Sequence, residues 1–139
     1  MDTTRAAYDE LYVYTMGRPR FILQHVVDAF GAQTASEHSK PIGVVFALVG
    51  LYLHVEKHFD GHQVQRAHKL LGDRKRDWPI VHLPFPTDRG TMTAADVLAA
   101  PAGAERDQAI DDWCQSVWTA FSSNRQIIID LLREYRIGA

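Results

Sequence analysis

The chain has 139 residues, of which 46% are hydrophobic and 23% are charged. These proportions are typical of one globular domain and exclude collagen-like, low-complexity and disordered chains. The formal net charge of -2 provides no basic field that would attract nucleic acid or an acidic membrane, so we expect neither as a partner. The most unusual feature of the composition is its histidine content: the chain has seven histidines and only one cysteine.

Three features of the sequence bear on where the protein works. A single cysteine, Cys114, excludes an internal disulfide and a paired-cysteine metal knuckle. The first residues include an acid and no apolar run, which argues against a signal peptide. The most apolar run, 41–53, is shorter than the about 20 residues that a membrane span needs. We therefore expect a soluble, cytoplasmic protein.

The first half of the chain has apolar residues at helical spacing, which predicts four helices at 3–16, 20–33, 41–59 and 61–71. The third is apolar nearly all round as far as Leu53, so we expect the other helices to enclose it. Pro41 suits the first turn of that helix, and Asp60 suits the N-cap of the next one.

The second half begins with an irregular, proline-rich segment over about 72–91. Thr93 and Asp96 form a capping pattern, which predicts a short helix as far as about Ala100. A long helical stretch follows, with a kink or break expected at 122–124. We predict a single all-α domain over 1–139, a bundle of five to six helices.

Three histidines, His25, His54 and His68, each fall within the apolar stripe of a different predicted helix. A buried imidazole needs a partner, and if adjacent helices of the bundle bring these three faces together, the histidines are partners for one another; the sequence leaves that convergence open. Three neutral imidazoles suit zinc or another first-row divalent metal and leave one position open for water or substrate. His58, one turn after His54, is a further candidate ligand. The alternative is that these histidines are core residues that are only hydrogen-bonded.

Two carboxylates lie close to these histidines in the sequence. Asp28 is one turn from His25, and Glu56 follows His54. Each is a candidate catalytic residue, as a general base or as a group that orients a metal ligand.

Small residues on the central predicted helix indicate a groove beside His54. Gly50 and Ala47 belong to this groove, which suits either close helix packing or a pocket for a small ligand, and Trp113 is a candidate for the pocket wall. Whether the protein is an enzyme stays open: a bound metal would polarise a carbonyl or activate water, whereas the rival hypothesis is a non-catalytic, homodimeric helical module.

One basic cluster, Arg74, Lys75 and Arg76, lies in the irregular segment. It is a candidate anion-binding site, or a solvated loop whose charges are balanced by the flanking Asp73 and Asp77.

Five stretches of the chain carry a family resemblance: QHVVDAFGAQ (24–33), LVGLYLHVE (48–56), DRKRDWP (73–79), TAADVL (93–98) and WCQSVW (113–118). Through them the chain resembles an uncharacterised family of small bacterial all-helical proteins. The resemblance implies a helical bacterial protein and no particular reaction. Many members begin with a cysteine pair that resembles a zinc knuckle, and this sequence lacks it, so no role of that segment is implied here. By its three histidines alone, the chain is also similar to DinB-like metal-binding helical bundles, an analogy of site rather than of sequence.

Overall fold

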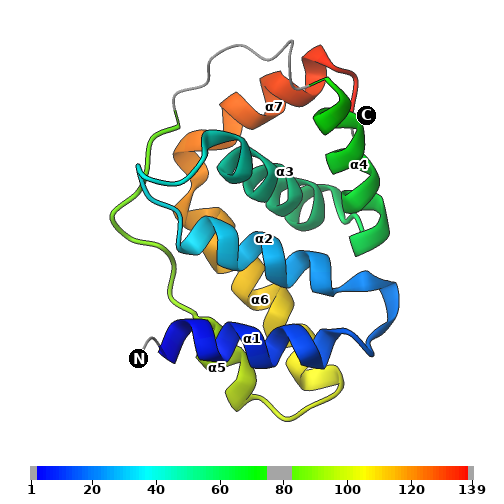
Figure 1. The fold of residues 1–139 in the computed structure, drawn as a ribbon, viewed down its shortest axis with the longest axis vertical. Coiled ribbons are helices and arrows are strands. Elements are labelled where there is room, and N and C mark those ends of the chain that lie inside the picture. The colour runs from blue at the N-terminus through cyan, green and yellow to red at the C-terminus, as the bar shows by residue number, and fades with distance from the viewer. Residues whose placement is uncertain (1–2, 75–82, 138–139) are drawn as a thin grey trace.

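The computed structural model describes residues 3–74 and 83–137, which form seven α-helices and no strand (Figure 1). The helices are α1 (Thr3–Thr15), α2 (Leu23–Gln33), α3 (Pro41–Lys57), α4 (Gly61–Asp73), α5 (Ala94–Ala99), α6 (Ala104–Ala120) and α7 (Arg125–Glu134). The all-α prediction is confirmed. The predicted count of five to six is too low, because the 3-10 turn η3 (Ser122–Asn124) divides the last helical stretch into α6 and α7.

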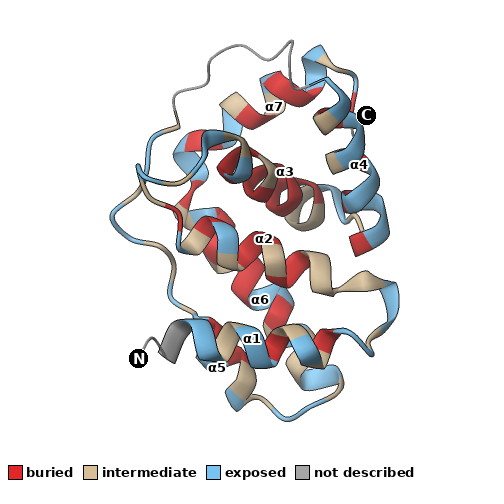
Figure 2. Ribbon diagram, viewed as in Figure 1, coloured by how far each residue is buried: buried red, intermediate tan, exposed pale blue. Residues whose placement is uncertain are grey.

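Helix α3 lies at the centre of the bundle, as its sequence predicts. Every residue from Ala47 to Leu53 is buried, and α3 packs against α2, α4, α6 and α7 (Figure 2). Each fully buried aliphatic side chain contributes roughly 1.5–3 kcal/mol to folding. The apolar surface of α3 therefore holds the other helices in place around it.

Two predicted helix starts are confirmed by their hydrogen bonds. The carboxylate of Asp60 accepts a bond of 2.9 Å from the amide of Gln63, and the side chain of Gln63 accepts one of 2.8 Å from the amide of Asp60. Thr93 and Asp96 form the same reciprocal capping box at the start of α5. These contacts are local, which explains why the sequence pattern alone was sufficient to predict them.

The backbone turns sharply at the C-terminal end of α3. His58 adopts the left-handed conformation, with φ of 60°, and the amide of Phe59 donates back to the carbonyl of Leu53 over 3.0 Å. The chain therefore turns back on α3, and the carbonyl of Phe59 faces the preceding turn of that helix. None of the described helices is long and apolar enough to cross a membrane.

Candidate functional site

A cavity of about 370 Å³ lies where α2, α3 and α6 meet the 3-10 turn η1 (Pro19–Phe21), and we call it the histidine pocket. Its lining comprises three imidazoles, three carboxylates, one guanidinium and an apolar part: His25, His54, His58, Asp60, Asp107, Asp111, Arg20, Pro19, Ile22 and Phe59. The lining residues come from three segments that are far apart in the sequence, 19–25, 54–60 and 107–111, so the pocket depends on the packing of the helices.

Two of the sequence-predicted residues meet face to face in this pocket. The rings of His25 on α2 and His54 on α3 are stacked, with centroids 3.5 Å apart and planes inclined by 16°. The sequence left open whether these faces meet, and the structure brings His25 and His54 together. The contact is a ring stack, however, and not a convergence of nitrogen lone pairs.

Both ring nitrogens of His54 have partners. Nδ1 donates to the carbonyl oxygen of Phe59 over 2.9 Å, and Nε2 lies 2.8 Å from a carboxylate oxygen of Asp111. A carbonyl and a carboxylate both accept, so both ring nitrogens of His54 face acceptors, and the contact with Asp111 is an ion pair when the ring is protonated. Neither nitrogen of His54 is free to bind a metal or to take a proton from a substrate.

Sequence reasoning missed Asp111 and Asp107. The two lie one turn apart, at i and i+4, on the predicted C-terminal helix, so they share a face. That spacing was the available signal. Nothing in it indicates which other helix the face would meet.

His25 differs from His54, because its Nδ1 has no hydrogen-bond partner among the described residues although it is buried. The side chain is only 3% exposed. Burial, reinforced by the neighbouring His54, lowers the pKa of His25 to about 3, so the ring is neutral at physiological pH. An unsatisfied buried polar group costs about 1–3 kcal/mol, which a bound molecule or water would offset by supplying a partner.

The third predicted ligand, His68, lies outside the histidine pocket. Its Nε2 donates to the carbonyl oxygen of Phe46 over 2.8 Å and lies 4.0 Å from Asp28. Burial lowers the pKa of His68, and the bond to Phe46 opposes that effect. The three predicted ligands are therefore not gathered in one place. Within 3–74 and 83–137, no group of three or more His, Cys, Asp or Glu side chains is arranged to hold a metal ion.

The space predicted beside Gly50 is occupied by Asp28. A Cβ atom built on Gly50 would overlap the carboxyl group of Asp28, which is buried and accepts a bond of 3.1 Å from Gln24. Burial raises the pKa of Asp28 well above its usual range, and the other carboxyl oxygen has no described partner. The small residue at position 50 makes room for this carboxyl group, and Asp28 does not line the histidine pocket.

The other residues of the predicted groove belong to the core. Ala47 is buried and lies opposite Gly31, where a Cβ would meet its own at 3.6 Å, as in close helix packing. Trp113 is fully buried, and its Nε1 donates to the side chain of Gln33 over 3.0 Å. Neither residue lines the histidine pocket.

Glu56, the other predicted catalytic carboxylate, joins three helices. It accepts bonds of 2.7 Å from Trp118 on α6 and 2.7 Å from Arg125 on α7. The bond from Arg125 lowers the pKa of Glu56, so the carboxylate is ionised and paired. These contacts give Glu56 a role in holding α3, α6 and α7 together, away from the histidine pocket.

Only one residue of the predicted basic cluster belongs to the described part of the chain. The guanidinium of Arg74 lies over the ring of Tyr135, 5.0 Å from its centroid. Lys75 and Arg76 lie outside the described residues.

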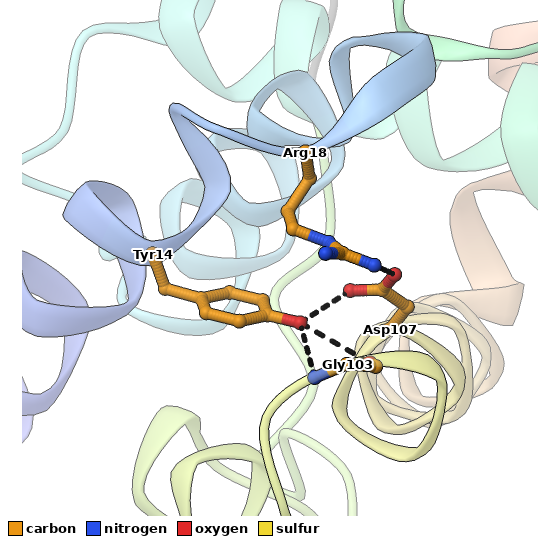
Figure 3. Close-up of polar contacts among 4 residues, drawn as sticks. All are labelled: Tyr14, Arg18, Gly103 and Asp107. Atoms are coloured by element: carbon orange, nitrogen blue, oxygen red, sulfur yellow. Dashed lines mark hydrogen bonds and ion pairs between the residues drawn. The ribbon is translucent and has the colours of Figure 1, made fainter.

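Asp107 lines the histidine pocket, and the polar contacts shown in Figure 3 hold its side chain in position. Its carboxylate accepts bonds of 2.6 Å from Arg18 and 2.6 Å from the hydroxyl of Tyr14, and that hydroxyl accepts one of 3.0 Å from the amide of Gly103. Burial alone would raise the pKa of Asp107, but the bonds from Arg18 and Tyr14 outweigh it and lower the pKa. The cluster connects the end of α1 and the loop after it to the start of α6.

Comparison with known proteins identifies a family for this chain and no reaction. No curated protein and no solved structure matches the chain. A family model does match residues 4–122, a range that includes every lining residue of the histidine pocket. The chain belongs to the family of unknown function DUF5946.

Proposed function

We propose that the protein binds a small zwitterion, of amino-acid type, in the histidine pocket. The observation that carries the proposal is the buried imidazole of His25, which lines a cavity of about 370 Å³ and has no partner for Nδ1. Nδ1 is itself buried, so a polar molecule in the cavity would reach it through a small shift of the ring and would thereby remove an energetic cost that the protein bears without it.

The charges around the cavity favour a ligand with no net charge. Asp111 is paired with His54, and Asp107 is paired with Arg18. The remaining lining charges are Arg20 and Asp60, which are opposite in sign. Arg20 has no ion pair within the described ranges, and the carboxylate of Asp60 is engaged only through the amide that it caps. A guanidinium and a carboxylate at one cavity are complementary to a molecule that carries both a carboxylate and an ammonium group.

The protonation states favour binding over acid–base catalysis. A general base works best when its pKa is close to the working pH, and the pKa of His25 is about 3. His54 has both nitrogens engaged. The stacked pair therefore offers a hydrogen-bonding group on His25 and no free base of suitable strength.

The test is a thermal-unfolding and calorimetric titration of the protein with the free L-amino acids, one at a time. Acetate and methylammonium, which each carry one of the two charges, serve as half-ligands. We expect at least one amino acid to raise Tm by several degrees, since a ligand at 100 times its Kd stabilises by about 2.7 kcal/mol. The half-ligands should not.

Two variants make the assignment specific to the pocket. His25→Phe keeps an aromatic ring in the stack and removes the nitrogens, so it should abolish the shift. His62→Phe is the matched control, because His62 also stacks on an aromatic ring, that of Phe21, but does not line the pocket. The proposal fails if no amino acid changes Tm, or if His25→Phe responds as the wild type does.

The metal hypothesis is tested on the same preparation. Elemental analysis of protein purified without a histidine tag would show about one equivalent of zinc or another first-row metal if the histidines bind one. One equivalent that is lost in His25→Phe would replace the zwitterion by a metal ion as the occupant of the pocket. A substoichiometric amount would remove the metal from consideration.

A further inference from the structure

A second cavity, of about 450 Å³, lies between the C-terminal part of α3 and α7, and shares no lining residue with the histidine pocket. We call it the α3–α7 cavity. Its size is within the roughly 300–1,000 Å³ of cavities that bind small molecules. It is built from seven residues of two kinds, apolar and cationic.

The floor of the α3–α7 cavity is apolar. Tyr52, Leu132 and Ile137 are buried, and Ile129 is half-buried beside them. The chain turns sharply after α7 to complete this floor: Arg136 adopts the left-handed conformation, with φ of 57°, and the amide of Ile137 donates to the carbonyl of Leu132 over 2.9 Å. The turn brings Ile137 into the core and leaves Arg136 exposed.

The remaining lining residues are all cationic. Lys57, Arg133 and Arg136 are exposed, and within 3–74 and 83–137 no carboxylate lines the cavity. Among the residues that the structure describes, none of the three has an ion pair within 4.0 Å. Glu56, whose carboxylate interacts electrostatically with Lys57, is already bonded to Arg125 and Trp118.

We propose that the α3–α7 cavity binds a single-chain amphipathic carboxylate, of fatty-acid type. The alkyl chain lies on the floor formed by Tyr52, Leu132 and Ile137, where its burial removes apolar surface from water. The carboxylate lies among Lys57, Arg133 and Arg136, because a guanidinium can donate two parallel hydrogen bonds to a carboxylate. Neither part alone explains the cavity: a purely apolar ligand would make no use of the three cations, and a small inorganic anion would leave the apolar part of the cavity unfilled.

The test is a calorimetric titration of the full-length protein with decanoate, below the concentration at which it forms micelles. Decylammonium has the same chain with the opposite charge, and butyrate has the same charge with a short chain. We expect decanoate to bind with a stoichiometry of one, and decylammonium and butyrate to bind at least tenfold more weakly.

Variants separate the two parts of the site. The double variant Arg133→Glu/Arg136→Glu should weaken decanoate binding at least tenfold, and Ile129→Ser should weaken it severalfold through the floor. Lys40→Glu is the matched charge reversal, because Lys40 is exposed at the other end of the 17-residue α3, about 25 Å from Lys57. This control should bind decanoate as the wild type does, and so should His25→Phe.

Three outcomes would overturn the proposal. Equal binding of decanoate and decylammonium would show adsorption to apolar surface without charge selection. Equal binding of butyrate and decanoate would show an anion site without a role for the floor. Unchanged binding by the Arg133→Glu/Arg136→Glu variant, with circular dichroism showing an intact fold, would place the ligand elsewhere.

Discussion

Replacing His25 by Phe should remove a specific part of the pH dependence of stability. In the folded protein, burial and the neighbouring His54 lower the pKa of His25 from 6.5 to about 3. In the unfolded chain His25 is therefore protonated below pH 6.5, whereas in the folded chain it stays neutral until the pH falls to about 3. The stability associated with neutral His25 is present above pH 6.5 and is lost progressively as the pH falls toward 3.

Between pH 7.5 and 5, the loss of stability caused by His25 depends only on the protonation of this residue in the unfolded chain. At about pH 5 the unfolded histidine is almost fully protonated, and the folded one is still neutral. Linkage then gives a loss of about 2 kcal/mol relative to pH 7.5, and this figure hardly depends on the folded pKa as long as that pKa is below about 4. The measured value should be of this order, since His25 is buried and little screened by solvent.

The assay is urea denaturation of the wild type and His25→Phe at both pH values. Asp28 acts in the opposite direction, because its raised pKa makes the folded state less stable as the pH rises, and His68 acts in the same direction as His25. Both residues are present in both proteins, so their contributions cancel in the difference between them. We expect the wild type to lose about 2 kcal/mol more than the variant between pH 7.5 and 5. Equal losses, within about 0.5 kcal/mol, would refute the assignment of a buried neutral imidazole at this position.

Asp28→Asn should remove the opposite dependence, the loss of stability that a raised carboxyl pKa causes as the pH rises above its ordinary value of 3.8, as measured by the same urea curves; identical pH dependence in the wild type and Asp28→Asn would contradict the raised pKa of Asp28. Gly50→Ala should lower the free energy of unfolding by roughly 1–3 kcal/mol despite the better helix propensity of alanine, because the new Cβ would overlap the carboxyl group of Asp28. Combined with Asp28→Ala, the same substitution should cost much less, and additive costs in that double-mutant cycle would argue against the overlap. Tyr14→Phe should destabilise by about 1–2 kcal/mol through its lost bonds to Asp107 and the loop before α6, measured by thermal unfolding. Tyr12→Phe is its control, since the hydroxyl of Tyr12 makes no hydrogen bond within the described part of the chain, and similar losses in both variants would rule out that origin.

Much of the fold was predictable because its signals are local. The capping boxes at Asp60 and Thr93 each need only four consecutive residues. The position of α3 followed from its apolar surface, since a helix that is apolar all round must be enclosed. The break at 122–124 was also visible in the sequence, but whether it separates two helices or bends one depends on how α7 packs, and the count of helices was too low for that reason.

The candidate site was predictable only in part. The stripe on α2 correctly indicated that His25 is buried, but the sequence left open whether its ring meets that of His54, and the packing of α2 on α3 decides that contact. The partner of His68 turned out to be a backbone carbonyl, that of Phe46, and backbone groups carry no signature in the side-chain pattern. Asp111 was missed, because its partner lies 57 positions away in the sequence.

Gly50 and Asp28 show the difference between what a sequence pattern predicts and what tertiary packing decides. The sequence pattern indicated a pocket at Gly50 and a catalytic role for Asp28. The structure gives both residues one explanation, because the absence of a side chain at Gly50 makes room for the carboxyl group of Asp28. The sequence by itself determined the class of the fold, the central helix, the caps and the inward direction of His25, because helical periodicity and capping act over a few residues. Tertiary structure alone decided which of the seven histidines meet and which nitrogen is left without a partner, because the contacts between helices depend on the packing of side chains that are far apart in the chain.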